Sequence, residues 1–149
     1  MESSEDRLRQ ITSRLRENNH KLTPQRLAIA RVIAESRDHP DIETIYNRIK
    51  PGFPRISLAT VYRNVMVVKS LGEAMEIGIP GSGVRYEGNR LDPHPHAVCE
   101  RCKKIVDLEP ESMTGFLESV QQATGFKIMT HRVDFFGLCR ACRQDDKPS

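Results

Sequence analysis

The chain has 149 residues, of which 38% are hydrophobic and 29% are charged, so it can form one domain or two small ones. A net charge of +3 is only mildly basic and does not by itself indicate a nucleic-acid ligand. The charged N-terminus does not read as a signal peptide, and no apolar run approaches the roughly 20 residues of a membrane-spanning helix. We therefore expect a cytoplasmic protein, whose cysteines bind metal or act as redox thiols instead of forming structural disulfides.

The first half of the chain has the apolar periodicity of helices. Residues 6–19 form the first predicted helix. Three more are expected to start at Thr23, Asp41 and Ser57, because each of these side chains can cap a helix N-terminus. Gly72 is expected to end the fourth helix.

After the helices, the period of the pattern changes to that of strands. Residues 73–79 and 84–88 are predicted strands, and the turn between them is rich in glycine. Helices followed by a hairpin are typical of a winged helix-turn-helix, in which the first turn of the fourth helix enters the DNA major groove. An ordinary small helical bundle is the alternative. Residues 46–72 carry five basic and no acidic residues, which fits either a solvated face or a DNA-binding one.

The second half reads as a smaller α/β module. Residues 96–100 and 104–108 are predicted strands, followed by a helix over 111–124 and a strand over 127–139. We therefore predict an α+β protein with a winged-helix DNA-binding domain at 1–87, a hinge at 88–95, and a module with a polar tail at 96–149.

Two Cys-x-x-Cys pairs, Cys99 with Cys102 and Cys139 with Cys142, are the strongest signal in the chain. Each pair supplies one edge of a zinc tetrahedron, and the 36 residues between them can leave and return as strand, helix and strand. A redox motif or four unlinked thiols are the alternatives, and the doubled pair argues against both. We expect structural zinc, because four thiolates leave no open position for catalysis.

Two histidines, His94 and His96, lie just before the first cysteine pair. Positions i and i+2 of an extended segment point to the same side. Since four thiolates complete the zinc site, these histidines are expected to serve a second site, with Glu87, Asp107 and His39 as partners. Such nitrogen and oxygen donors suit Fe(II) or Mn(II). Taken singly, each histidine is equally well explained as a surface or core residue.

Five segments together make the chain resemble the ferric uptake regulator (Fur) family of bacterial metal-dependent repressors over roughly residues 10–143. They are LTPQR at 22–26, ATVYRN at 59–64, HPH at 94–96, CERC at 99–102 and CRAC at 139–142. The resemblance implies a homodimer with an N-terminal winged helix and a C-terminal α/β dimerisation domain, which binds inverted-repeat operator DNA when its regulatory metal is present. It also implies that the four cysteines hold structural zinc. The implied ligands of the regulatory Fe2+ or Mn2+ are His39, Glu87, His94, His96 and Asp107.

Seven residues are predicted to bind operator DNA. Those expected at base edges or the nearby backbone are Ser57, Thr60, Tyr62 and Arg63. Those expected at phosphates are Arg26, Arg55 and Lys69. For Tyr62, a half-buried packing role is the alternative.

The carboxylate ligands divide between two branches of the family. The peroxide-sensing branch has Asp at both carboxylate positions and iron sensors have Glu, so Asp107 matches the first and Glu87 the second. We predict a peroxide-responsive repressor in which Fe(II) promotes oxidation of His39 and His94. An iron- or manganese-responsive uptake repressor is the alternative.

A further metal site of iron-sensing members is not expected. Pro95 and Thr114 occupy two of its positions, and only His131 matches. We also expect no enzymatic activity. A small metallohydrolase using His94, His96 and a carboxylate is a remote alternative, since no His-Glu-x-x-His segment is present. A purely structural zinc module is a third reading.

Overall fold

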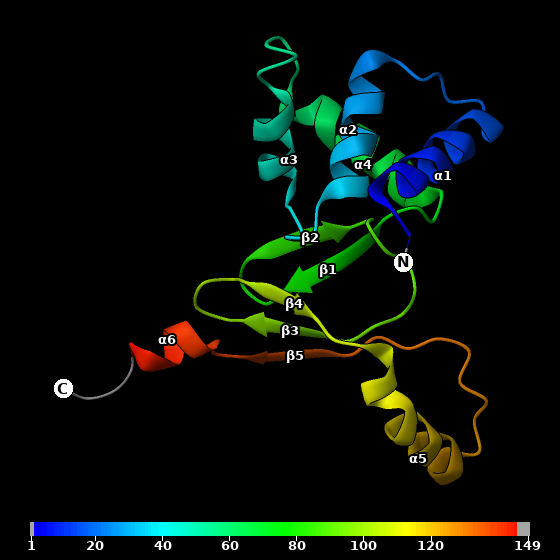
Figure 1. The fold of residues 1–149 in the computed structure, drawn as a ribbon, viewed down its shortest axis with the longest axis vertical. Coiled ribbons are helices and arrows are strands. Elements are labelled where there is room, and N and C mark those ends of the chain that lie inside the picture. The colour runs from blue at the N-terminus through cyan, green and yellow to red at the C-terminus, as the bar shows by residue number, and fades with distance from the viewer. Residues whose placement is uncertain (1, 146–149) are drawn as a thin grey trace. The chain divides into compact units, whose positions relative to one another are not determined.

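The computed structural model describes residues 2–145 and has an α+β fold, as predicted (Figure 1). The chain divides into two compact units, Met1–Leu91 and Asp92–Ser149, which we call the N-terminal and C-terminal units. Within the described residues, no helix is long and apolar enough to cross a membrane.

Four helices make up most of the N-terminal unit. They are α1 (Ser4–Glu17), α2 (Pro24–Glu35), α3 (Ile42–Ile49) and α4 (Leu58–Ser70). The predicted caps at Thr23, Asp41 and Ser57 are confirmed, because each side chain accepts a hydrogen bond from the backbone N–H three residues later. The helix α1 begins earlier than predicted, because Ser3 and Asp6 form a capping box.

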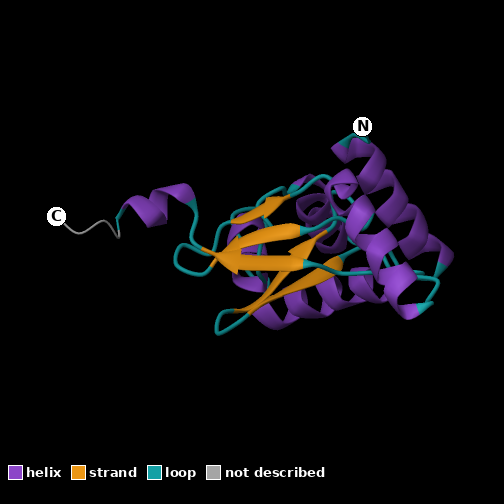
Figure 2. Ribbon diagram, turned by 90° about the horizontal axis from the view of Figure 1, so that it is seen from below, coloured by secondary structure: helices purple, strands orange, loops and turns teal. Residues whose placement is uncertain are grey.

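A two-stranded antiparallel hairpin follows the helices, formed by β1 (Met75–Ile79) and β2 (Gly83–Glu87) (Figure 2). Gly81 in its turn and Gly83 at the start of β2 have positive φ, a conformation that other residues adopt at a cost. Tyr86 of β2 belongs to the same buried core as the four helices. The helices and the hairpin therefore share one core, as a winged helix-turn-helix requires.

Arg7 ties α1 to both ends of the hairpin. Its side chain is only 1% exposed, and its Nε donates to the carbonyl of Gly88 at 2.8 Å. Its other nitrogens reach Glu73, with Nη1 at 3.1 Å from Oε2 and Nη2 at 3.2 Å from the carbonyl oxygen. Because Glu73 precedes β1 and Gly88 follows β2, the guanidinium of Arg7 holds both ends of the hairpin against α1.

Gly88 lies where no side chain fits. A Cβ at this position would come within 2.1 Å of Ile33 Cγ2 and 3.2 Å of two carbonyl oxygens. We expect Gly88→Ala to lower the free energy of unfolding of this unit by about 1–3 kcal/mol, because the core must shift to admit the methyl group. Urea unfolding followed by tyrosine fluorescence measures this change. Gly78→Ala is the matched control, because a Cβ there meets nothing within 4 Å. Equal stabilities of the two variants would contradict the packing argument.

The C-terminal unit is built on a three-stranded sheet in the order β4-β3-β5. Its strands are β3 (His96–Cys99), β4 (Ile105–Asp107) and β5 (Asp134–Gly137), and β3 pairs antiparallel with β4 and parallel with β5. The 3-10 helix η1 (Pro110–Met113) leads into α5 (Thr114–Thr124), and α6 (Arg140–Gln144) follows β5 (Figure 1).

The strand predicted over 127–139 is wrong in its length. Only residues 134–137 pair, because β3 has four residues and offers no partner to the preceding segment. Residues 125–133 therefore lack regular structure, and Met129 is 81% exposed. The helix α6 was not predicted, and the part of the polar tail at 146–149 lies outside the described residues.

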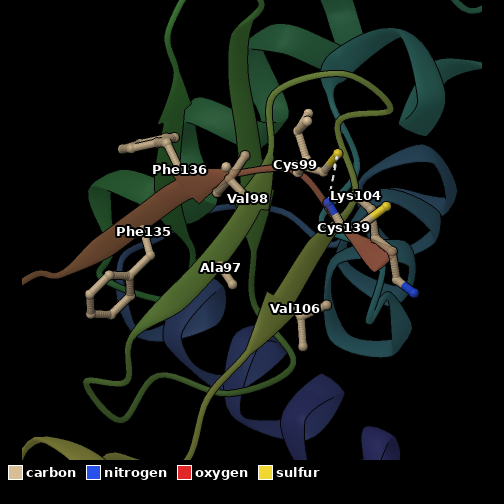
Figure 3. A pocket seen from close by; sticks show the side chains of 10 residues that line it. Ala97, Val98, Cys99, Lys104, Val106, Phe135, Phe136 and Cys139 are labelled. Carbon is tan, nitrogen blue, oxygen red and sulfur yellow. Dashed lines mark hydrogen bonds between the residues drawn. The ribbon is translucent and has the colours of Figure 1, made fainter. Parts of the chain in front are cut away.

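The C-terminal unit has a small core and an exposed apolar surface. Its described buried hydrophobic residues are Val98, Cys99, Ile105, Met113 and Cys142. The helix α5 buries no side chain. On one face of the sheet, Val106, Ala97 and Phe135 lie in register, and the first and last of them are exposed. Phe135 and Phe136 leave β5 in opposite directions and border a groove over the sheet (Figure 3).

Candidate metal sites

The four cysteines converge at one end of the C-terminal sheet. Their sulfur atoms all lie within 4.8 Å of one another. Cys99 ends β3 and Cys102 lies in the next turn, which closes with the Lys103 N–H donating to the Cys99 carbonyl at 2.9 Å. Cys139 is the N-cap residue of α6, and Cys142 lies inside that helix. Two turns from distant parts of the chain thus place four sulfurs around one point.

The surroundings of these sulfurs differ, although their chemistry is the same. The backbone N–H of Cys139 donates to the Cys99 sulfur at 3.4 Å, and this bond, together with the backbone N–H groups of Cys102 and Arg101, lowers the pKa of Cys99 to about 6. Burial raises the pKa of Cys142 to about 12. A cation bound among the sulfurs would favour the thiolate form of all four. A set of four sulfurs with no oxygen or nitrogen donor fits closed, structural zinc.

A second donor set lies in the C-terminal unit around His94, His96 and Asp107. The Nε2 atoms of the two histidines lie 3.4 and 3.5 Å from the Asp107 Oδ1. These separations match those of neighbouring ligands on one ion, roughly 3–3.5 Å for metal–ligand bonds of about 2.1 Å. Each Nδ1 faces an acceptor instead, the Asp92 carbonyl at 2.7 Å for His94 and the Asp134 Oδ1 at 3.1 Å for His96. Both rings are therefore oriented as metal-binding histidines usually are.

The N-terminal unit carries the remaining predicted ligands, His39 and Glu87. His39 Nε2 lies 3.2 Å from Glu87 Oε1, and both side chains are buried. His39 has a φ of +52°, which is unusual for a residue other than glycine. Hydrogen bonds hold its turn in place, with Arg85 donating to the carbonyls of Asp38 and His39 and the Tyr86 N–H donating to Pro40.

The first two turns of α4 present polar and aromatic side chains to solvent. Tyr62 is 51% exposed and Arg63 is exposed beside it. Thr60 and Ser57 share a 2.9 Å hydroxyl contact, and Ser57 is also the helix cap. The exposure of Tyr62 leaves it available to a ligand, and its DNA-binding role stays a prediction.

The three predicted phosphate contacts lie in different environments. Arg55 is exposed in the turn before α4. Arg26 donates to the Asn64 side chain at 2.8 Å and to the Lys21 carbonyl at 2.7 Å, so it also joins α2 to α4. Lys69 forms an ion pair with Glu76 at 2.6 Å. A phosphate would have to compete with these bonds at Arg26 and Lys69.

Two residues near the metal sites were not predicted from the sequence. Asp134 lies beside His96, and Arg85 supports the turn of His39. Neither stands in a recognisable motif, and their roles depend on strand register and loop packing. His131, predicted to lie on a strand, precedes β5 in the segment without regular structure.

Comparison with known proteins decides the family. The model of the "Ferric uptake regulator family" matches residues 17–136. The chain belongs to the ferric uptake regulator family. The resemblance seen in the sequence is thereby confirmed, and the winged-helix and α/β architecture is that of Fur proteins.

Individual Fur-family proteins are similar to the chain over nearly its whole length. The peroxide-responsive repressor PerR of Staphylococcus aureus is 36% identical over 143 residues, covering 96% of each chain. The Helicobacter pylori ferric uptake regulator Fur, whose structure has three functional metal-binding sites, superposes with a TM-score of 0.84 at 25% identity over 98% of this chain and 97% of that one. PerR from Streptococcus pyogenes gives a TM-score of 0.52 at 30% identity over 91% and 92%.

Proposed function

We propose that this Fur-family protein is a metal-dependent transcriptional repressor that responds to peroxide. The observation that carries the proposal is the presence of two chemically distinct donor sets, one of four sulfurs and one of imidazoles and carboxylates. The first set suits a permanent structural ion, and the second suits an exchangeable Fe2+ or Mn2+. The similarity to peroxide-responsive repressors supports the same reading.

The regulatory ion is proposed to take ligands from both units. His94, His96 and Asp107 would come from the C-terminal unit, and His39 and Glu87 from the N-terminal one. Because Glu87 ends β2 and His94 closely follows it in the chain, an ion bound to both would restrain the junction between the units. To shift an equilibrium between open and closed arrangements from 1:99 to 99:1, the ion must bind the closed one about 10⁴-fold more tightly.

The closed arrangement would serve DNA binding by a homodimer. A second copy is proposed to cover the exposed apolar face of the C-terminal sheet, which includes Val106 and Phe135. The dimer would present two α4 helices to an inverted-repeat operator, with Tyr62 and Arg63 at the bases. Such a repressor would act in the cytoplasm, where the operator lies.

Peroxide would release the repressor by damaging a ligand. Fe2+ held by the proposed ligands would supply the redox chemistry that activates hydrogen peroxide. In the net reaction, one oxygen of hydrogen peroxide would be inserted into an imidazole C–H bond of His39 or His94, and the other would leave as water. The modified ring is a weaker ligand, so the metal and the operator are lost. Mn2+ in the same site reacts poorly with peroxide.

The test is operator binding by fluorescence anisotropy under anaerobic conditions, on a duplex selected from a random library. Protein loaded with Fe2+ is expected to release the duplex after a small addition of peroxide, whereas protein loaded with Mn2+ stays bound. Mass spectrometry should find one added oxygen atom in peptides with His39 or His94. The peptides with His20 and His131 are internal controls and should remain unmodified.

A second function is favoured by one residue, Glu87, which matches the carboxylate of iron sensors. An iron- or manganese-responsive uptake repressor would retain operator DNA with either metal after peroxide. This outcome would overturn peroxide sensing. A metallohydrolase is not proposed, because the family to which the chain belongs is one of regulators.

A further inference from the structure

Three side chains form one row across the C-terminal sheet. His96 on the central strand β3 is paired in register with Asp107 on β4 and with Asp134 on β5. Residues paired in register point to the same face of a sheet. The imidazole of His96 therefore lies between two carboxylates that come from opposite neighbouring strands.

The two ring nitrogens of His96 face different carboxylates. Nε2 lies 3.5 Å from the Asp107 Oδ1, and Nδ1 lies 3.1 Å from the Asp134 Oδ1. The other oxygen of Asp134 is also engaged, because Arg132 Nε donates to Oδ2 at 3.0 Å. The side chains of His96 and Asp134 are only 6% and 11% exposed, so the contact between them is little weakened by water.

We propose that Asp134 is a positioning residue of the regulatory metal site, which rests on the function proposed above. It accepts a hydrogen bond from the Nδ1–H of His96. The other ring nitrogen, Nε2, then carries no proton, and its lone pair points toward Asp107. A neutral imidazole has one N–H, so the partner of one nitrogen determines whether the other can bind metal. Arg132 in turn holds Asp134 in the orientation that this hydrogen bond needs.

Asp134 does not act as a ligand itself in this arrangement. Its two oxygens are engaged by His96 Nδ1 and Arg132 Nε, on the side of the ring opposite Nε2. His94 differs, because its Nδ1 faces the backbone carbonyl of Asp92. The two neighbouring histidines are therefore unequal, and the one with a carboxylate partner is the more basic ligand.

The variant that tests this role is Asp134→Asn, which keeps the size of the side chain and removes its charge. We expect Mn2+ to bind about 10-fold to 100-fold more weakly, as measured by competition with a fluorescent chelator in zinc-loaded protein. Zinc content should not change. Nitrogen-15 NMR of the imidazoles should show the Nδ1–H tautomer for His96 in the parent protein and a mixture of tautomers in the variant.

Three further variants separate positioning from a structural role. Asp134→Glu restores the carboxylate and should recover part of the affinity. Arg132→Gln changes an exposed residue and removes one of the two hydrogen bonds to Asp134, so it should weaken Mn2+ binding by a smaller factor. The test therefore does not depend on the folding of a single variant. Asp145→Asn removes an exposed carboxylate of the same unit and should leave affinity unchanged.

The possible failures are distinguishable. Parent-like Mn2+ affinity in Asp134→Asn, with a parent-like tautomer, would overturn the positioning role and leave the proposed function intact. A parent protein that binds zinc but no Mn2+ or Fe2+ would overturn the proposed function, and the positioning role with it.

Discussion

Replacing Cys142 with serine should strip zinc from the protein and unfold residues 92–145, while α1–α4 remain folded. The C-terminal unit buries few apolar side chains, and its helix α5 buries none. The cysteine cluster links the end of β3 to α6, and the Arg101 side chain adds a 2.8 Å bond to the Cys142 carbonyl. Structural zinc contributes apparent binding energies of about 10–16 kcal/mol in small domains, which this core cannot replace.

Hydrogen exchange measures this result region by region. Peptides from residues 92–145 should lose protection in Cys142→Ser, and those from α1–α4 should keep it. Ala141→Ser is the matched control, because it places a serine in the same turn at an exposed position that carries no ligand. Preserved exchange protection in a zinc-free variant would show that the core suffices without the metal.

Replacing Arg7 with alanine should destabilise the N-terminal unit by on the order of 3–5 kcal/mol, the usual result of removing one partner from a buried ion pair. The change leaves Glu73 with the longer contact to Arg14 Nε at 3.6 Å and removes the donor to the Gly88 carbonyl. The chain has three tyrosines and no tryptophan, and Tyr46, Tyr62 and Tyr86 all lie in this unit. Tyrosine fluorescence during urea unfolding therefore reports on this unit alone.

Arg9→Ala is the control for that experiment. Arg9 lies on the same helix and forms an ion pair with Asp6, but its side chain is 74% exposed. Exposed pairs contribute little to stability, so the unfolding midpoint should hardly move. If Arg7→Ala were equally mild, the guanidinium would be dispensable to the hairpin.

The helices and the cysteine cluster were predictable because their signals are local. Thr23, Asp41 and Ser57 are caps whose chemistry acts within one turn, and each was found where predicted. The two Cys-x-x-Cys pairs come together because each pair sits in its own turn and only one fold-back is needed. The assignment of the regulatory ligands and of the DNA-binding residues stays a prediction.

Features that depend on register and packing were not predictable. The strand predicted over 127–139 is only four residues long in the structure, because its length is limited by the partner strand and not by its own propensity. Asp134 is close to His96 only because β3 and β5 pair in parallel with one register. Arg7 reads as one more charged position of an amphipathic helix, and its burial depends on carbonyl groups more than sixty positions away.

The long sequence separation between Arg7 and its hydrogen-bond acceptors also affects folding during synthesis. Its acceptors at Glu73 and Gly88 emerge from the ribosome only after all four helices have been synthesised. Until then its guanidinium must remain hydrated, so α1 cannot bury this side chain during early synthesis. Burial of the Arg7 side chain is therefore expected only after the strand that carries Glu87 has been completed.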